Sequence, residues 1–399
     1  MSRSSTALAW LDAELARLET EQLRRQLRMR SSAQGPEIQL DGRSLVNFAS
    51  NDYLALADEP AVVDAVRSTC DERGFGSGAS PLVVGRDSEH AQLEAALAEF
   101  EGVEASLLFP SGFAANSGTI PALVGVDDVI LSDAKNHASL VDGCRLSRST
   151  VHVYRHADAD HVAQLLDETE SARRRLIVTD SLFSMDGDLA PLSLLATLAQ
   201  QHDAMLLVDE AHATGVFGSQ GRGVAEHLGV EPSVDIKIGT LSKALGGAGG
   251  FVAGSQSLID WLANRARSYV FSTASPSVLA SAALAALRIV NQQPERRIDL
   301  LARAAQLRHQ LTEQGWRIGA SQSQIIPIYV DEPEAAVTMS AQLADRGFLV
   351  PAIRPPSVPA GESLLRLSLR WDHTPTMLDK LLAALAEMER PSDRARPPN

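Results

Sequence analysis

The chain has 399 residues, of which 45% are hydrophobic and 22% charged, a composition that is typical of a globular protein with a sizeable core. Its formal net charge of −14 argues against a nucleic-acid partner, because phosphate backbones require a basic surface. The two cysteines, Cys70 and Cys144, show no metal-ligand spacing, and we expect no metal. Without an apolar run long enough for a signal peptide or a membrane span, the sequence predicts a cytoplasmic protein with no membrane partner.

The first expected element is an amphipathic helix. Leucines recur at near-helical spacing between residues 8 and 27 with charges between them, and we expect this helix to pack on the body of the protein. The stretch LVNFASNDYLAL, residues 45–56, then indicates a short strand that enters a loop. The sequence therefore predicts an N-terminal helical segment over residues 1–48.

A regular alternation of helical and apolar stretches follows, over residues 49–290. The expected strands are 105–109, 128–133, 174–180, 204–210, 235–240 and 250–255. Runs such as LIVTD and LLVDE are apolar up to their last residue, as strands covered on both faces are. The pattern predicts a large α/β domain with a mainly parallel sheet.

The remainder of the chain indicates a smaller domain. A long stretch rich in alanine and leucine near 275–315 precedes expected strands at 323–330, 348–353 and 364–370, with helices at about 333–346 and 374–389. We predict a C-terminal α+β domain over residues 291–390. The proline-rich and polar residues 391–399 are predicted to be a disordered tail.

Polar side chains cluster at the carboxyl ends of the expected central strands, where open α/β sheets bind their ligands. In chain order they are His137, Ser184, Asp209 with His212, and Thr240 with Ser242 and Lys243. Each alone has an ordinary explanation, such as a helix cap or a turn. Four neighbouring strand ends that deliver an imidazole, a hydroxyl, a carboxylate and an amine favour one shared site.

The lysine in this set stands out. Lys243 is one of four lysines and lies among small residues in GTLSKALGGAGGFVAGS, where it could be a phosphate ligand, a covalent nucleophile or an accident. A lysine, a carboxylate and nearby hydroxyls are what pyridoxal phosphate (PLP) chemistry needs, because the amine forms a Schiff base and the carboxylate keeps the pyridine nitrogen protonated. FPSGFAAN, with Ser111, Gly112 and Phe113, supplies a helix start for the phosphate. The sequence contains neither a P-loop nor a dinucleotide fingerprint.

These residues also resemble a known family. VDEAHATGVFGSQGRG, TLSKALGGAGGFVAGS, PSGFAAN, SMDGD and SNDYLAL look like motifs of the α-oxoamine synthases, and the matches span roughly residues 20–390. This resemblance implies PLP fold type I with a seven-stranded sheet, and a condensation of an amino acid with an acyl thioester that releases CO2. AIRPPSVPAGESLLRLSL, residues 352–369, resembles the biotin-pathway member, which uses L-alanine and a pimeloyl thioester carried on coenzyme A or on a carrier protein.

The resemblance implies roles by position for the cofactor site. Lys243 would form the Schiff base and later take the Cα proton, Asp209 would pair with the pyridinium, and His137 would stack on the ring. The ring oxygen would be bound by His212 and Ser184, and the phosphate by Thr240, Ser242, Ser111 and the amides of Gly112 and Phe113. Ser272 and Thr273 match residues that reach the neighbouring subunit's phosphate, which implies a homodimer with shared sites.

The resemblance also implies the substrate contacts. Arg366 matches the arginine that binds the amino acid carboxylate, Asn51 lies at the same site, and Arg25 and Ser357 match further substrate contacts, as does His137. Arg28 and Arg354 are further candidates for the anionic part of the thioester.

Three positions depart from the family pattern. Pro81, Arg86 and Ala55 stand where relatives commonly carry other residues, on the side of the acyl chain, so the exact thioester stays open. One alternative function is that of another α-oxoamine synthase, which uses glycine, serine or a different acyl chain. A second alternative is a non-catalytic subunit, which the presence of Lys243 in a complete set disfavours.

Overall fold

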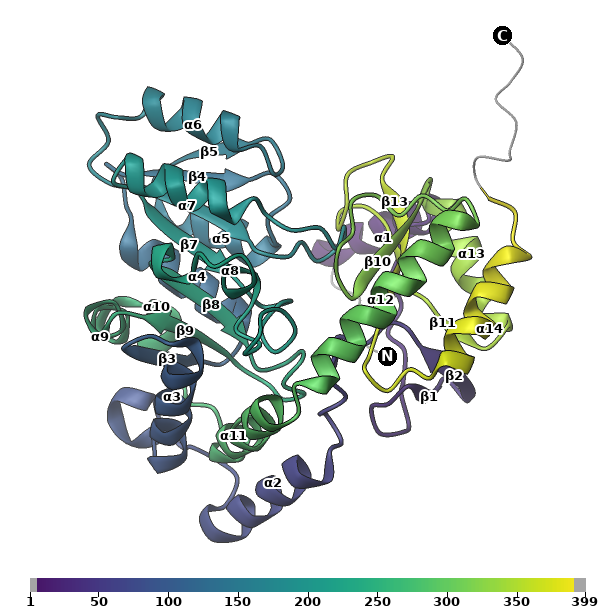
Figure 1. Ribbon diagram of the computed structural model, residues 1–399, viewed down its shortest axis with the longest axis horizontal. Helices are drawn as coiled ribbons and strands as arrows, with labels where there is room; N and C mark the ends of the chain where they lie inside the picture. The colour runs from purple at the N-terminus through teal and green to yellow at the C-terminus, as the bar shows by residue number, and fades with distance from the viewer. Residues whose placement is uncertain (1–5, 391–399) are drawn as a thin grey trace. The chain divides into compact units, whose positions relative to one another are not determined.

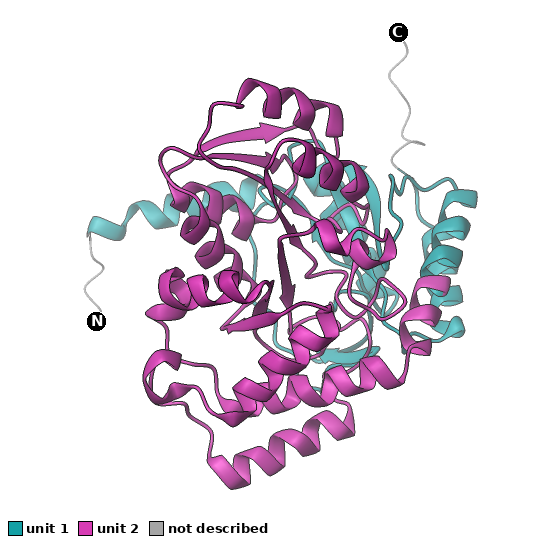
Figure 2. Ribbon diagram, turned by 60° about the vertical axis from the view of Figure 1, so that its left-hand side comes forward, with its two compact units in different colours: residues 1–50, 303–399 teal, residues 51–302 magenta. Residues whose placement is uncertain are grey.

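The computed structural model describes residues 6–390, and the predicted tail at 391–399 lies outside the described residues. The chain divides into two compact units (Figure 2): a large unit of residues 51–302, and a terminal unit that combines residues 1–50 with residues 303–399. The sequence pattern separates the N-terminal segment from the C-terminal domain, whereas contacts join them in one unit. The long helix α12 (Glu295–Glu313) contains the boundary between the units.

The large unit is built on one seven-stranded sheet (Figure 1). Its strands are β3 (Ala105–Phe109), β4 (Val129–Asp133), β5 (Thr150–Tyr154), β6 (Arg175–Asp180), β7 (Met205–Asp209), β8 (Ile236–Thr240) and β9 (Gly250–Gly254). Their order is β3-β9-β8-β7-β6-β4-β5, and only β9 is antiparallel to its neighbours. Every residue of β4, β8 and β9 is buried, as expected for strands covered on both faces. The predicted fold class is confirmed.

Ten helices of the described chain belong wholly to this unit. They are α2 (Pro60–Arg73), α3 (Ser88–Glu101), α4 (Gly112–Leu123), α5 (Ala138–Ser147), α6 (Ala159–Glu168), α7 (Leu192–Gln201), α8 (Val224–His227), α9 (Gln256–Arg265), α10 (Arg267–Val270) and α11 (Ser277–Gln292). Side chains accept backbone N–H bonds at the start of several of them, including Ser111 at α4 and His137 at α5. These caps fix the positions at which the chain leaves the sheet.

The terminal unit holds two three-stranded sheets, β1-β2-β11 and β10-β13-β12. Its other elements beside α12 are α1 (Trp10–Thr20), α13 (Pro333–Asp345) and α14 (Pro375–Ala386), and its strands are β1 (Glu37–Leu40), β2 (Arg43–Asn47), β10 (Ile325–Asp331), β11 (Phe348–Leu349), β12 (Ala352–Ile353) and β13 (Ser363–Ser368). The strand expected over 348–353 is therefore two short strands that serve different sheets. Because β2 pairs with β11, the N-terminal segment and the C-terminal domain form one unit.

The expected N-terminal helix forms as α1, but the prediction that it packs on the body is wrong. No residue of α1 is buried, and Trp10 and Leu15 are 60% and 41% exposed. The helix ends at Thr20, so Leu23 and Leu27 do not extend its apolar stripe. The stripe that remains is too short to form a core of its own.

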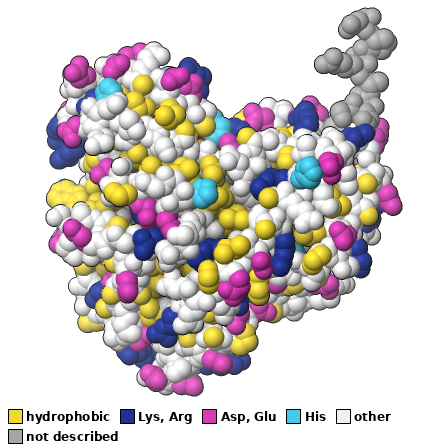
Figure 3. Space-filling model, viewed as in Figure 1, with side chains coloured by type: hydrophobic (Ala, Val, Ile, Leu, Met, Phe, Trp, Pro, Cys, Tyr) yellow, Lys and Arg dark blue, Asp and Glu magenta, His cyan; other side chains and the backbone are white. Residues whose placement is uncertain are grey.

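On the face of the molecule seen in Figure 3, acidic and basic side chains are interspersed, and neither kind forms a continuous patch. Among the helices of residues 6–390, none is both long enough and apolar enough to cross a membrane.

A buried ion cluster lies near the amino end of β8. Lys237 Nζ lies 2.9 Å from Glu231 Oε1 and 3.5 Å from Glu101 Oε2, and Lys237 and Glu101 are each 2% exposed. Burial raises the pKa of Glu101 to about 8, although the Lys237 ammonium opposes the shift. Glu101 is therefore mostly protonated near neutral pH, and Glu231 is the anionic partner of Lys237.

Replacing Glu101 by glutamine is expected to change how stability depends on pH. The pKa of Glu101 is higher in the folded chain than its ordinary value of 4.5, so wild-type stability is lost as the pH rises from about 5 towards about 8. Glutamine stays neutral at every pH. The free energy of unfolding of Glu101→Gln, relative to that of wild type, should therefore rise as the pH increases over this window. Urea unfolding at several pH values measures it. Glu99→Gln, on the exposed side of α3, is the matched control; parallel pH profiles for all three proteins would contradict the assignment.

Candidate active site

The predicted site residues meet at one edge of the large sheet. β8, β7, β6 and β4 are consecutive parallel neighbours, so their carboxyl ends open on the same edge. Asp209 ends β7 beside Asp180, which ends β6. His137, Ser184 and Lys243 follow the ends of β4, β6 and β8 in the chain. The sheet order thus brings together side chains that are far apart in the sequence.

Asp209 is held by two hydrogen bonds. Asn116 Nδ2 donates to Asp209 Oδ2 at 2.6 Å, and the Ala211 amide donates to Asp209 Oδ1 at 2.8 Å, while the residue is only 4% exposed. Asn116 Nδ2 also lies 2.9 Å from Ser139 Oγ on α5. Asn116 was not predicted as a site residue, although it stands in the FPSGFAAN motif; its place on the second turn of α4 could have indicated an inward side chain.

His137 caps α5, and its imidazole lies within electrostatic reach of this carboxylate. Its backbone amide donates to Asp180 Oδ2 at 2.7 Å, and its Nδ1 lies 2.7 Å from Ser139 Oγ. Burial lowers the pKa of His137, the Asp209 carboxylate opposes this, and the Lys243 ammonium adds to it. A neutral, flat ring near neutral pH suits stacking on an aromatic cofactor.

Asp180 lies beneath this group. Burial is the main cause that raises the pKa of Asp180 well above its ordinary value, and the neighbouring Asp209 carboxylate raises it further. The hydrogen bond from the His137 amide and the Lys243 ammonium lower the pKa and only partly offset this rise. The same two ionic neighbours, Asp209 and Lys243, thus act on both His137 and Asp180. The half-buried Lys243 therefore lies within electrostatic reach of His137 and of the buried Asp180 carboxyl.

The turn that carries Lys243 is tightly packed. Gly246 has a φ of +65°, and a Cβ there would lie 2.5 Å from the Ala57 amide nitrogen. Leu241 donates its amide to Gly249 O, which closes the turn between β8 and β9. The glycines after the lysine therefore serve a close approach of backbone to backbone.

His212 has a partner that the sequence analysis missed. Tyr53 Oη lies 2.6 Å from His212 Nδ1 and 3.2 Å from Asn51 Oδ1, so a phenol links an expected cofactor residue to an expected substrate residue. Tyr53 is fully buried and stands in the SNDYLAL stretch. In the same stretch Ala55 adopts a φ of +56°, a conformation that glycine adopts more easily, which gives a physical reason for the glycine that is usual there.

An anion cradle lies where β3 and β8 end and β9 begins. Ser111 Oγ accepts the Ala114 amide at the start of the 12-residue helix α4, and Thr240 Oγ1 lies 2.8 Å from Ser242 Oγ. A Cβ on Gly250 would lie 2.5 Å from the Gly112 amide nitrogen, so β9 approaches the helix start as only glycine allows. Amides at a helix start beside two hydroxyls form a site for phosphate.

The other predicted cofactor residues lie in turns and at helix starts of the large unit. Ser184 is half-buried in the turn after β6, and Phe113 is 47% exposed at the start of α4. Ser272 is half-buried and Thr273 exposed in the segment that precedes α11.

Three residues that were predicted to contact the substrate, Arg25, Ser357 and Arg366, lie in the terminal unit. Arg25 Nη2 lies 3.3 Å from Ser357 Oγ, so the structure brings these two residues together. Arg366 is buried in β13 and donates to Ser368 Oγ at 3.0 Å. In the large unit, Arg86 forms an ion pair with Glu94 at 2.6 Å.

Known proteins resemble this chain in sequence and in fold. A family model described as aminotransferase class I and II matches residues 43–385. An 8-amino-7-oxononanoate synthase from Anaeromyxobacter dehalogenans is 50% identical over 380 residues, which are 95% of each chain. Another, from Geobacter sulfurreducens, is 48% identical over 377 residues, 94% of this chain and 96% of that protein.

Solved structures extend the comparison. A serine palmitoyltransferase from S. paucimobilis with a bound PLP–myriocin aldimine has a TM-score of 0.91 at 30% identity, covering 96% of this chain and 98% of that one. The chain thus belongs to the aminotransferase class I and II family, with the PLP-dependent fold of type I. Within it, its place is among the 8-amino-7-oxononanoate synthases, which are acyltransferases of the α-oxoamine synthase group.

The residues at the sheet edge fit PLP. The buried carboxylate of Asp209 suits a pyridinium, Lys243 supplies the amine, and the cradle at Gly112 suits a phosphate. Asn116 Oδ1 is buried and has no hydrogen-bond partner among the described residues, which leaves an acceptor beside the expected ring nitrogen.

Replacing Asn116 by alanine is expected to weaken PLP binding. Asp209 would keep only the Ala211 amide, and a lost hydrogen bond to a buried carboxylate raises the dissociation constant about tenfold. Titration of the apoprotein by the visible absorbance of bound PLP measures this. Asn264→Ala, which removes an exposed amide bonded only to Asp260 O, should bind as wild type does. If Asn116→Ala bound PLP as tightly as wild type, the proposed role of Asn116 in holding Asp209 would be refuted.

Proposed function

We propose that the chain catalyses a PLP-dependent decarboxylative Claisen condensation of L-alanine with a pimeloyl thioester, which yields 8-amino-7-oxononanoate, CO2 and a free thiol. The observation that carries this is the meeting of Lys243, Asp209 and His137 at one sheet edge, in a chain half identical to 8-amino-7-oxononanoate synthases over 95% of its length. In this reaction a carbon–carbon bond forms at the thioester carbonyl, the thiolate leaves, and the amino acid carboxylate departs as CO2. We further propose a cytoplasmic location, in keeping with this biosynthetic role.

Lys243 has two tasks in this proposal. Bound PLP would supply an electron-withdrawing ring and an aldehyde that the Lys243 amine would hold. With alanine bound, the free Lys243 amine would take the Cα proton of the amino acid, so it must be uncharged at that stage. Asp209, held by Asn116 and the Ala211 amide, keeps the proton on the pyridine nitrogen.

The other residues of the edge bind and orient. The neutral His137 ring would stack on the cofactor, and His212 and Ser184 would hydrogen-bond its ring oxygen. Thr240, Ser242 and the first amides of α4 hold the phosphate. These contacts align the Cα–H bond of the amino acid with the lysine, which a loosely held cofactor would not do.

The terminal unit supplies charges for the anionic substrates. Arg366 is 5% exposed and has a planar guanidinium suited to the alanine carboxylate. Burial and the nearby Arg25 guanidinium lower the pKa of Arg354. Two guanidiniums that repel each other favour an anion between them, such as the far carboxylate of a pimeloyl chain or the phosphates of coenzyme A.

A different amino acid is the second candidate, because several solved neighbours are serine palmitoyltransferases at 30–32% identity. We expect L-alanine with pimeloyl thioester to give the highest kcat/KM in a panel that crosses alanine, glycine and serine with pimeloyl and palmitoyl thioesters. CO2 release is the measurement. Lys243→Ala, which should fold and bind PLP without the covalent bond, is the blank: turnover that persists in it would show that the lysine is misassigned.

Replacing Arg366 by alanine is expected to raise KM for alanine at least about tenfold, because a buried charge-assisted pair with the carboxylate is lost. KM for the thioester should change little. Arg366→Lys keeps the charge without the planar fork and should fall in between. Steady-state kinetics with each substrate varied in turn separate the two KM values; an unaltered KM for alanine would place its carboxylate elsewhere.

We also propose that the protein is a homodimer. Leu82, Val83 and Val84 are 53%, 72% and 76% exposed in the turn over residues 81–85, and Phe271 is 72% exposed in the segment beside it. The Ala274 amide donates to Ala79 O, which joins these two segments into one apolar surface next to Thr273. Exposed apolar side chains grouped in this way indicate an interface.

Placing a charge in that surface should separate the subunits. Val83→Glu is expected to shift the sedimentation coefficient from that of a dimer to that of a monomer, because the charge would be desolvated at the interface. Val126→Glu, at a valine 71% exposed elsewhere in the large unit, is the control and should leave the dimer intact. A wild-type protein that sediments as a monomer would refute the dimer.

A further inference from the structure

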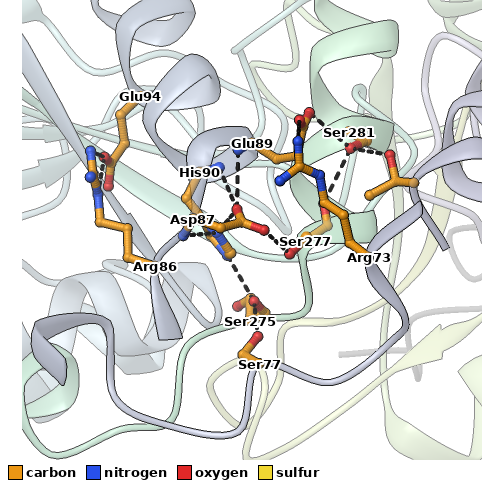
Figure 4. Close-up of polar contacts among 11 residues, drawn as sticks. Arg73, Ser77, Arg86, Asp87, Glu89, His90, Glu94, Ser275, Ser277 and Ser281 are labelled. Carbon is orange, nitrogen blue, oxygen red and sulfur yellow. Dashed lines mark hydrogen bonds and ion pairs between the residues drawn. The ribbon is translucent and has the colours of Figure 1, made fainter. Parts of the chain in front are cut away.

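The first turn of α3 carries a polar network that the proposed mechanism does not use. Figure 4 shows its two arms, one from Asp87 and His90 to the segment before α11, the other from Arg86 to Glu94. The first arm joins residues nearly two hundred positions apart in the sequence.

Asp87 and His90 form the first arm. Asp87 caps α3 and accepts the amides of Glu89 and His90, and His90 Nδ1 lies 2.7 Å from Asp87 Oδ1. The other ring nitrogen, Nε2, donates to the Ser275 carbonyl at 2.8 Å. Ser277, the first residue of α11, donates its Oγ–H to Asp87 Oδ2, so the pair contacts both the segment and the helix that follows it.

The segment so held carries Ser272 and Thr273. Ser77 Oγ donates to the same Ser275 carbonyl at 2.7 Å, and Ser80 Oγ donates to Val270 O at 3.2 Å. Ser272 and Thr273 thus lie between two anchored carbonyls. Because Thr273 itself is exposed, the direction of its hydroxyl depends on those anchors.

The second arm connects the same turn to β3, the strand that leads to the anion cradle of the same chain. Arg86 Nη2 lies 2.6 Å from Glu94 Oε2, and Glu94 Oε1 accepts the Leu108 amide of β3, the strand that leads to Ser111. Both arms line one cavity of about 30 Å³, whose wall also includes Ser272 and Thr273. Arg86, a departure from the family pattern, is therefore engaged within its own chain.

We propose that His90, oriented by Asp87, is a positioning residue that sets the backbone of residues 272–275 so that Ser272 and Thr273 bind the phosphate of the partner subunit's cofactor. This inference rests on the proposed homodimer with shared sites. A capping residue needs only the nitrogen that faces its own helix start, and His90 uses that nitrogen for Asp87. Its second nitrogen, buried with the ring, serves the Ser275 carbonyl alone.

Two substitutions at His90 separate positioning from capping. An asparagine amide overlays Nδ1 and keeps the contact with Asp87, whereas a glutamine amide reaches the place of Nε2 and can still donate to Ser275 O. We expect His90→Asn to raise the dissociation constant for PLP about fivefold, and His90→Gln to stay within about twofold of wild type. PLP titration of the apoprotein by visible absorbance is the readout, with sedimentation to verify the dimer.

Matched variants guard against a purely structural effect. Asp158→Ala removes a comparable helix cap, at α6, and should lower the melting temperature without changing PLP affinity. If His90→Asn does not fold, Ser277→Ala removes only the hydroxyl that holds Asp87, and should weaken PLP binding about threefold. Equal PLP affinity of Ser277→Ala and wild type, or of a folded His90→Asn and wild type, overturns the proposal.

A mixed dimer tests that the effect crosses the interface. When Lys243→Ala and His90→Asn are on the same chain and the other chain is wild type, the single lysine-bearing site faces the altered segment, and its PLP affinity should fall. When the two substitutions are on different chains, the lysine-bearing site faces an intact segment and should bind PLP as wild type does. The reverse pattern, or equal affinities, overturns the proposal.

Thr273→Ala distinguishes this inference from the function on which it rests. It should weaken PLP binding about tenfold, and the double variant with His90→Asn should be no weaker, because His90 acts through this segment. If Thr273→Ala binds PLP normally, the shared phosphate site fails and the positioning role fails with it. If Thr273→Ala weakens binding and His90→Asn does not, only the positioning role fails.

Discussion

The buried carboxylate of Asp209 is the constraint on which the site depends. At 4% exposure a charge is costly unless hydrogen bonds and opposite charges surround it, so β7 can end there only if α4 supplies Asn116 and the chain turns back to present the Ala211 amide. The same carboxylate raises the pKa of Asp180 and opposes the lowering of the pKa of His137. In the proposed function, the Lys243 amine and the protonated pyridine nitrogen of PLP are the cations that lie near the Asp209 carboxylate.

Close backbone approach is the second requirement. Because β9 runs antiparallel between β3 and β8, its first residue, Gly250, meets the start of α4, and a Cβ there would lie 2.5 Å from the Gly112 amide nitrogen. The cradle proposed for the phosphate is therefore made of the end of β8, the start of β9 and the start of α4, which a side chain on Gly250 would separate. The glycines beyond Lys243 belong to this packing as much as to the site.

Much of the fold and site could be predicted from the sequence. Six strands of the central sheet and the order of polar residues at their ends follow from short apolar runs, whereas the edge strand β5, with its mixture of exposed and buried positions, escaped notice. Asn116 and Tyr53 were missed because an amide within a helix and a phenol in a loop have no distinctive pattern until their partners are known. The exposure of α1 could not be predicted either, because a helical periodicity of leucines indicates an amphipathic helix but does not indicate what its apolar face packs against.

The sequence by itself determined which side chain stands at the end of each strand, because strands and caps depend on neighbouring residues. That was enough to indicate a reactive lysine, a pyridinium-binding carboxylate and a helix start for phosphate. Only the tertiary structure decided the strand order β8-β7-β6-β4, the hydrogen bond of Asn116 to Asp209, and the bond of His90 to a carbonyl 185 residues away. Such pairings depend on packing across the whole unit, and local residue patterns do not encode them.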